Sequence, residues 1–306
     1  MQKLLIDTDP GVDDALALLM ALRHPAAEVV GITVSAGNVG LQHTVANALR
    51  LVERCAATVP VFAGCDRPLV LPAADAAYVH GRDGFGDAGL PPAQRRAEPE
   101  HAVQAILRLS REHAGELTLV TLGPLTNLAL ALRLDPALPS RVSRLLVMGG
   151  AVTAHGNITA SAEFNIHFDP EAARVVFDAW PDFELVDWEA TLGHTVADAE
   201  FADWLAAGGE LARFYDVISR QTRAFIRTHH GDAFHSADAL AMAVVLEPDI
   251  TSDLRRHRIE VELAEGLYRG ATRVDWMNRD PRGPNAAIVG RVELARFHAL
   301  LRMAIA

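Results

Sequence analysis

The sequence lacks the features that are typical of membrane proteins, secreted disulfide scaffolds and thiolate metal sites. No apolar run approaches the ~18 residues of a membrane-spanning helix. Only two cysteines, Cys55 and Cys65, occur in 306 residues, and they form no CxxC pair, so we expect two reduced thiols. The apolar stretch before Asp7 is too short for a signal peptide. We therefore expect a soluble, cytoplasmic protein.

Positive charge is also scarce. The chain has 28 Lys and Arg residues against 39 Asp and Glu residues, which gives a formal net charge of −11. An excess of negative charge opposes binding to phosphate backbones and to anionic membranes, so we expect neither nucleic acid nor a membrane as partner. Half of the residues are apolar, which is enough for a large core.

Apolar stretches that are typical of strands alternate with longer stretches of helical spacing. The strands are predicted at 3–6, 29–35, 59–62, 117–122 and 144–148, and the helices at 13–23, 42–55, 100–113, 125–134 and 170–179. Continuous apolar strands that alternate with helices indicate a parallel sheet covered on both faces. The predicted fold class is α/β, a three-layer sandwich with a mainly parallel central sheet.

Three irregular stretches interrupt this alternation, around residues 69–96, 151–169 and 221–237. The first is rich in Ala, Gly and Pro, the second is polar, and the third holds three of the thirteen histidines. Long loops within a compact domain are more often functional than idle. Because no linker or repeat is visible, we predict a single domain over 1–306 in which these loop insertions build a site.

An acidic segment lies at the end of the first predicted strand. Asp7-Thr8-Asp9-Pro10-Gly11-Val12-Asp13-Asp14 holds four carboxylates, and an apolar helix begins directly after it. Such a group is stable only if it is solvated or binds a cation, and Asp oxygens suit calcium or magnesium. Ligands of open α/β sheets bind at the carboxyl ends of strands. A metal site is therefore favoured over a solvated turn, which would not normally be held between two buried elements.

Further polar side chains suit a ligand that is rich in hydroxyl groups. Asn38 follows the second predicted strand and is either a turn residue or a ligand contact. Asn157, Glu163 and Asn165 lie in the long loop after residue 148, where they either bind sugar hydroxyls or form a polar surface. Asp238 opens an apolar helix, either as a first-turn acid or as a distant carboxylate of a calcium site.

The histidines form no known catalytic motif. His80, His229, His230 and His235 fall in the predicted irregular stretches, where a lone histidine is usually a surface residue. The chain has neither a G-x-S-x-G elbow with Ser-His-Asp order nor an H-E-x-x-H motif.

Taken together, these motifs resemble the calcium-dependent nucleoside hydrolases of the inosine-uridine-preferring type. The opening acidic segment is similar to that family's highly specific signature, and the resemblance continues in order along nearly the whole chain. It includes Gly37-Asn38, Val79-His80-Gly81, Leu122-Gly123-Pro124-Leu125-Thr126-Asn127, Met148-Gly149-Gly150, Gly156-Asn157, Ala162-Glu163-Phe164-Asn165, Asp169-Pro170-Glu171-Ala172 and Asp238. It implies a nucleoside hydrolase-like fold.

The resemblance implies that the protein hydrolyses ribonucleosides to free base and ribose. Ca²⁺ would be bound by the carboxylates of Asp9, Asp14 and Asp238 and by the backbone carbonyl of Leu122. Asp9 would also be the general base that activates a calcium-bound water. Such an attack inverts the anomeric configuration, since no carboxylate is free to form a glycosyl-enzyme.

The resemblance also implies a substrate-binding set and an assembly. The ribose hydroxyls would be held by Asp13, Asn38, Asn157, Glu163 and Asn165. His80 and Phe164 would lie beside the nucleobase. Family members form dimers or tetramers, so we expect a homodimer or a homotetramer.

One position departs from the family pattern. Many members carry a histidine directly before the last calcium-binding Asp, and that histidine protonates the leaving base. This chain has Ala237 there. The substitutes are His235, His80 or His230, or stacking on Trp188 or Tyr215. Because pyrimidine leaving groups are harder to protonate on the ring, we expect a weak preference for purine nucleosides.

Two other functions are compatible with parts of the sequence. A magnesium-dependent phosphatase of the haloacid-dehalogenase type also carries Asp-x-Asp after its first strand, but it has no use for the later Asn and Glu residues. A non-catalytic nucleoside-binding protein would keep the same ligands without turnover, and Ala237 favours it. The intact Asp9 favours the hydrolase.

Overall fold

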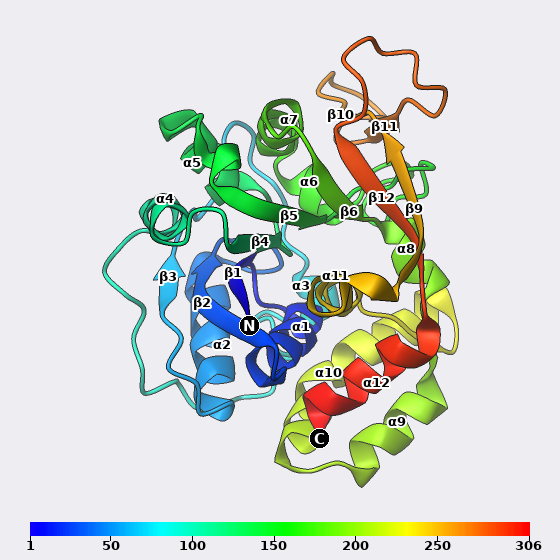
Figure 1. The fold of residues 1–306 in the computed structure, drawn as a ribbon. Helices are drawn as coiled ribbons and strands as arrows, with labels where there is room; N and C mark the ends of the chain where they lie inside the picture. The colour runs from blue at the N-terminus through cyan, green and yellow to red at the C-terminus, as the bar shows by residue number, and fades with distance from the viewer.

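The computed structural model describes residues 1–306 and centres on an eight-stranded sheet (Figure 1). The strand order from edge to edge is β3-β2-β1-β4-β5-β6-β12-β9. Neighbouring strands are parallel except β9, which is antiparallel to β12. The bounds are β1 (Gln2–Thr8), β2 (Ala27–Val34), β3 (Val61–Ala63), β4 (Leu117–Thr121), β5 (Val142–Met148), β6 (Phe183–Val186), β9 (Thr251–His257) and β12 (Ala286–Val292). The predicted fold class is confirmed.

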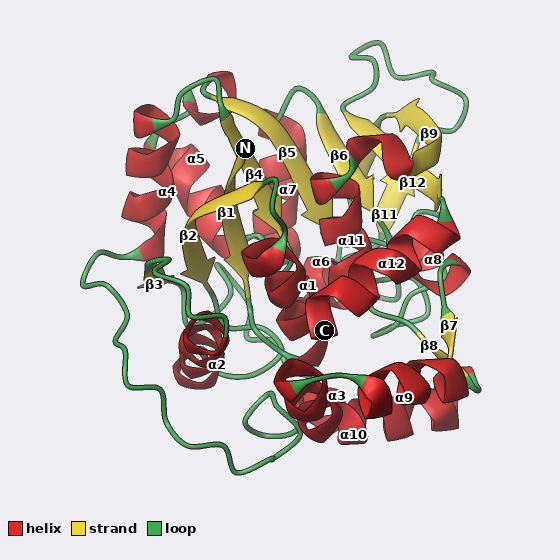
Figure 2. Cartoon of the chain, turned by 60° about the horizontal axis from the view of Figure 1, so that its bottom comes forward, coloured by secondary structure: helices red, strands yellow, loops and turns green.

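Helices cover both faces of the sheet, so the molecule has three layers (Figures 1 and 2). One face carries α4 (Ala102–Glu112), α5 (Thr126–Leu134) and α7 (Pro170–Ala179). The other face carries α1 (Val12–Arg23), α2 (Leu41–Arg54), α11 (Ala237–Leu246) and α12 (Leu294–Ile305), with α9 (Asp198–Ala207) and α10 (Glu210–His230) outside them. Along β1, Leu4 and Ile6 enter one apolar core and Leu5 enters the other, as strand alternation requires.

Helix α11 carries Asp238 into the interior. Every residue of α11 is buried, as expected of a helix that is apolar on all sides. Its carboxyl end is fixed by Arg144 of β5, which donates to the carbonyls of Val244 at 3.0 Å and Val245 at 3.2 Å. No helix of the chain combines the length and the apolar character that crossing a membrane would require.

The prediction of an irregular stretch over 221–237 is partly wrong. Residues up to His230 belong to α10, and only the segment after it is irregular, apart from β8 (Ala233–Phe234), which pairs with β7 (Val196–Ala197). Helix α10 forms because Phe214, Ile218, Thr222 and Ile226 recur every four residues and are buried together along one stripe. His229 and His230 are therefore helical.

The other two predicted insertions also contain helices. The stretch 69–96 includes α3 (Ala77–His80), which packs against α10, and the stretch 151–169 includes α6 (Phe164–Phe168). His80 is accordingly a buried residue on a short helix and not a surface residue in a loop. Helix α8 (Trp188–Gly193) follows β6.

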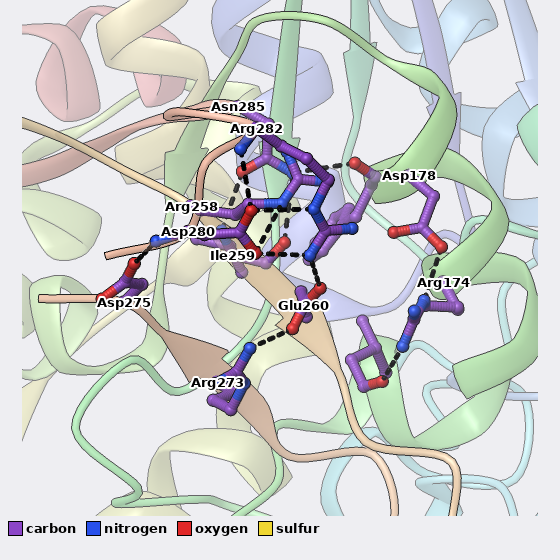
Figure 3. A network of polar contacts seen from close by, with 12 residues as sticks. Arg174, Asp178, Arg258, Ile259, Glu260, Arg273, Asp275, Asp280, Arg282 and Asn285 are labelled. Carbon is purple, nitrogen blue, oxygen red and sulfur yellow. Dashed lines mark hydrogen bonds and ion pairs between the residues drawn. The ribbon is translucent and has the colours of Figure 1, made fainter. Parts of the chain in front are cut away.

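A hairpin of β10 (Ile259–Val261) and β11 (Thr272–Val274) lies against α7 and is fixed by ion pairs (Figure 3). Glu260 pairs with both Arg273 and Arg282, and Arg282 also donates to Asp280 at 2.5 Å. The side chain of Asn285 closes the network by accepting from the backbone N–H of Ile259 at 2.7 Å.

Candidate active site

The carboxyl ends of β1, β2, β4 and β5 open onto a cavity of about 300 Å³. This size is at the lower end of the range for small-molecule sites. The cavity brings together most of the residues that the sequence singled out. Its lining includes Asp13, Asn38, His80, Leu122, Asn157, Glu163, Phe164, Asn165, His235 and Asp238. Asp9 and Asp14 are fully buried and are not part of the lining.

Three carboxylates converge beside this cavity. Asp13 and Asp14 come from the first turn of α1, and Asp238 comes from the first turn of α11. Their oxygens can all lie within 4.8 Å of one another. No Lys or Arg lines the cavity. The arrangement therefore concentrates negative charge that no Lys or Arg of the lining offsets.

Asp9 lies next to this group in a tightly fitted position. Its Oδ2 accepts from the backbone N–H of Asn38 at 2.6 Å, whereas its Oδ1 is buried without any hydrogen-bond partner. A Cβ atom at Gly37 would overlap Oδ2, and one at Gly123 would overlap Oδ1. The carboxylate is thus enclosed by two glycines, after β2 and after β4, and one of its oxygens has no hydrogen-bond partner within the chain.

Asp14 is held by hydrogen bonds from the segment that precedes it and from Asn38. It accepts from the Thr8 hydroxyl, from the backbone N–H of Gly11 at 3.0 Å and from the Asn38 amide at 2.9 Å. Asp7 has a separate role, because its Oδ1 accepts from Thr33 at 2.6 Å and from Asn127 at 2.9 Å. The acidic segment therefore does not act as a single group of four carboxylates.

Burial raises the pKa of all four carboxyl groups at the site. For Asp9 and Asp238 the pKa lies well above its usual range, because burial is reinforced by the neighbouring carboxylates. For Asp13 and Asp14 the main cause is again burial. A bound cation would reverse these shifts by stabilising the ionised forms.

A second part of the lining consists of side chains that form hydrogen bonds to the backbone. Glu163 caps α6, accepting from the N–H groups of Asn165 at 2.9 Å and Ile166 at 3.2 Å, and from Gly150 at 2.9 Å. Burial still raises its pKa to about 7. The amide of Asn165 donates to the carbonyl of Leu122 at 2.7 Å, which places that carbonyl at the cavity.

Histidine and aromatic rings form the rest of the lining. His80 accepts the backbone N–H of Val12 at its Nδ1, at 3.1 Å. His235 packs edge-on against Trp188 and His230, with ring centroids 5.1 and 5.3 Å apart, and its Nε2 is buried without a partner. Burial lowers the pKa of both His80 and His235 to about 4.

Several lining residues were missed by sequence reasoning. Tyr78 of α3 and the residues Thr222, Phe225, Ile226 and His229 of α10 face the cavity. The four-residue spacing of α10 would have indicated Thr222 and Ile226 had it been recognised. Of the two stacking candidates, Trp188 lines the cavity, whereas Tyr215 is fully buried elsewhere, against Phe201.

The loop that carries Asn157 is tied to α8. Glu189, the residue after Trp188, accepts from the backbone N–H groups of Val152 at 2.9 Å and Thr153 at 2.6 Å, and from the Thr153 hydroxyl at 2.8 Å. Asn157 in turn accepts the N–H of Phe164 at 2.8 Å. One helix therefore supplies both an aromatic lining residue and the anchor of the neighbouring loop.

Comparison with known proteins gives consistent matches. Residues 4–299 match the family described as inosine-uridine preferring nucleoside hydrolase. The pyrimidine-specific ribonucleoside hydrolase RihB of Escherichia coli is 35% identical over 275 residues, covering 90% of this chain and 87% of RihB. The structure of an inosine-guanosine nucleoside hydrolase has a TM-score of 0.92 and 33% identity, covering 99% of this chain and 98% of that chain. A purine-preferring ribonucleoside hydrolase from Gardnerella vaginalis has a TM-score of 0.91 and 29% identity, with the same coverage.

Proposed function

The chain belongs to the inosine-uridine preferring nucleoside hydrolase family, and we propose that it cleaves the N-glycosidic bond of ribonucleosides to give free base and ribose. The observation that carries this proposal is the buried acidic group, with the unpartnered Oδ1 of Asp9, beside a cavity lined by hydroxyl-binding amides. The family match over nearly the whole chain goes against the phosphatase alternative.

We propose Ca²⁺ as the cofactor. The converging donors are all oxygens, which suit a hard cation, and no Lys or Arg of the lining competes for them. Asp14, Asp238 and Asp9 would hold it with the Leu122 carbonyl, and Asp13 lies within the same group. Bound there, Ca²⁺ would supply positive charge that lowers the pKa of a water molecule.

Asp9 is proposed as the general base. Its Oδ1 is free of hydrogen bonds and faces away from the Oδ2 that Asn38 fixes, so it can accept a proton from the attacking water. The carboxylates of the site also stabilise the positive charge that develops on the ribose as the bond breaks. Because Asp9 accepts a proton and forms no bond to the sugar, the anomeric configuration is inverted.

The remaining lining residues are proposed to bind substrate. The ribose hydroxyls are assigned to Asp13, Asn38, Asn157, Glu163 and Asn165, whose amide and carboxylate groups can donate to or accept from them. Phe164 and His80 would lie beside the base. His235, whose buried Nε2 has no partner, would form a hydrogen bond to the leaving base.

Base preference is a finer proposal. We propose a weak preference for purine nucleosides, because Ala237 offers no proton to a pyrimidine ring. The relatives include both types, since RihB is named pyrimidine-specific and the Gardnerella enzyme purine-preferring. A homodimer or homotetramer in the cytoplasm is proposed with it, and light scattering of the purified protein tests the assembly.

The test is release of ribose from inosine, adenosine, guanosine, uridine and cytidine, with and without a chelator. Chelator-sensitive release supports the hydrolase, and the ranking of nucleosides tests the purine preference. A protein that binds these nucleosides without releasing ribose from any of them would instead be a nucleoside-binding protein, the alternative that Ala237 favours.

A further inference from the structure

We propose that the substrates this site cleaves best are N-ribosides whose base is already a cation, such as N-ribosylpyridinium compounds and purine ribosides alkylated at N7. The inference rests on the proposed function and adds a substrate class to it.

The buried residues of the lining include no strong proton donor, and His229, whose Nδ1 bonds to the carbonyl of Phe225 at 2.9 Å, is exposed on α10. The lining has no Lys or Arg. His80 receives the Val12 N–H at its Nδ1, and a nitrogen that accepts a hydrogen bond carries no proton, so the ring is the neutral Nε2–H tautomer. A neutral imidazole can form a hydrogen bond to a leaving base but is a poor donor of a whole proton.

His235 is no better placed to deliver a proton. Its ring is enclosed edge-on by Trp188 and His230, and no carboxylate forms a hydrogen bond to its buried Nε2 that would favour the charged form. Burial lowers its pKa to about 4, so it is neutral near pH 7. Burial also lowers the pKa of the neighbouring His230.

The other groups that could donate a proton are unsuited as well. Burial raises the pKa of Glu163 to about 7, but both of its oxygens already accept backbone N–H groups, so a proton on either oxygen would compete with these hydrogen bonds. Burial raises the pKa of the Tyr78 phenol, which makes it a weaker acid than usual. A neutral base would therefore leave with little assistance from this chain.

A cationic base needs no such assistance. The C1′–N bond breaks, its electron pair moves to the ring nitrogen, and the ring cation becomes a neutral molecule. The water oxygen forms the new bond to C1′, and its proton passes to Asp9 and then to solvent. Riboside cation and water thus yield ribose, neutral base and one proton, and no other reactant is required.

The cavity also suits a cation by charge and by shape. Asp13, Glu163 and Asp238 line it, and no Lys or Arg is present to repel a positive ring. Aromatic residues line it as well, and their ring faces attract cations. They are Tyr78, Phe164, Trp188 and Phe225. The same absence of Lys and Arg leaves a carboxylate or phosphate on the ligand without a partner.

The test compares matched substrates on the calcium-loaded protein. The assay is run at a slightly acidic pH, where 7-methylguanosine and guanosine differ by one methyl group and by the positive charge of the methylated ring. We expect kcat/KM to be at least about 100-fold higher for 7-methylguanosine, the range that a missing general acid accounts for. Nicotinamide riboside and nicotinic acid riboside share a pyridinium leaving group, and the carboxylate of the second should raise KM about tenfold, because it loses its hydration beside Asp13, Glu163 and Asp238 without gaining a Lys or Arg partner.

Each outcome decides between the two proposals. Guanosine hydrolysed within about tenfold of 7-methylguanosine would show that the chain supplies a proton after all, and it would overturn the cationic preference while the hydrolase stands. No ribose from any of the four compounds, nor from inosine or uridine, would overturn the proposed function itself. We expect ribose to be released from 7-methylguanosine and nicotinamide riboside, with little released from guanosine.

Discussion

Two groups of acidic side chains in this protein have opposite surroundings. At the β10–β11 hairpin, Glu260 and Asp280 are paired with arginines, and the pKa of each lies below its usual range because of these partners (Figure 3). At the cavity no arginine or lysine is present, and burial raises the pKa of each carboxyl group. The second group consists of Asp9, Asp13, Asp14 and Asp238.

The difference separates a structural network from a binding site. Arginine partners at the hairpin neutralise the carboxylates within the chain, so that region needs nothing from outside. Carboxylates that are buried together without a cation destabilise the folded state unless they take up protons or bind a metal. The site group therefore costs stability that a ligand can restore, which is typical of functional sites.

The largest effect is expected for Asp9→Asn. The amide keeps an oxygen for the Asn38 N–H but cannot act as a base, so kcat should fall about 1,000-fold. The matched control is Asp7→Asn, a buried carboxylate outside the site that bonds to Thr33 and Asn127, and it should retain at least about a tenth of kcat. Initial-rate assays of ribose release give kcat for both variants. An equal fall in kcat for Asp9→Asn and Asp7→Asn would contradict the placing of Asp9 in the site and Asp7 outside it.

Next comes Gly123→Ala, which tests how closely Asp9 is fitted. The added methyl group would meet Oδ1 of Asp9, so the carboxylate must move and kcat should fall about 100-fold. Gly40→Ala is the control, because a Cβ atom there meets nothing within 4 Å. Activity assays and circular dichroism of both variants distinguish a displaced Asp9 carboxylate from a misfolded chain. An unchanged kcat in Gly123→Ala would contradict the close fit of Asp9 against Gly123.

The stability of the chain without a bound cation is expected to depend on pH. Burial raises the pKa of Glu163 and of Asp187 to about 7 in the folded chain, from ordinary values of 4.5 and 3.8. The stability that each group contributes is fully present below its ordinary pKa, where the carboxyl group is protonated. It is lost as the pH rises to about 7 and the buried group ionises. Thermal melts of the chelator-treated protein should thus show a Tm that falls between about pH 4 and pH 7.

One substitution and the addition of Ca²⁺ test the expected fall in Tm. Asp187→Asn can still accept the N–H of Ala190 but cannot ionise, so its Tm should fall less with rising pH. Adding Ca²⁺ at 100 times its Kd should stabilise the wild-type chain by about 2.7 kcal/mol. A Tm that Ca²⁺ leaves unchanged at pH 7 would count against the cation site.

A smaller effect is expected for Glu189→Gln. The amide removes one of the two acceptor oxygens that hold Val152 and Thr153, so the loop that carries Asn157 is less well placed. We expect KM to rise about tenfold with kcat nearly unchanged, the loss of one charged hydrogen bond. Glu200→Gln, an exposed position on α9, is the control. A fall in kcat without a change in KM would assign Glu189 another role.

The smallest effect is expected at the hairpin. Glu260→Gln weakens the pairs to Arg273 and Arg282 and should lower the free energy of unfolding by about 1 kcal/mol. Activity should not change, and urea unfolding together with ribose release checks both statements. The exposed Glu265→Gln is the control. Lost activity in Glu260→Gln would show that the two acidic groups are coupled.

The first half of the fold was predictable because strands and helices alternate strictly there. The predicted helix over 170–179 and the structural α7 coincide, and α1 differs by one residue. The second half was less predictable, because α10 is polar on most of its surface and its buried stripe includes Thr222. Its pattern is visible only when every fourth residue is compared.

The candidate site divides in the same way. Asp9, Asp13 and Asp14 are close in sequence, so their proximity could be predicted from one motif. Which oxygens converge depends on α11, which brings Asp238 from far along the chain. The contact of His235 with Trp188 and His230 requires three separate segments, and no local pattern indicates it.

The central claim is that the acidic group beside the cavity is a cation site. Calorimetric titration of the chelator-treated protein with Ca²⁺ tests it most directly. We expect one site per chain in the wild type and none in Asp238→Asn, with the fold of the variant intact by circular dichroism. No heat of binding in the wild type, or the same affinity in the variant, would contradict the account.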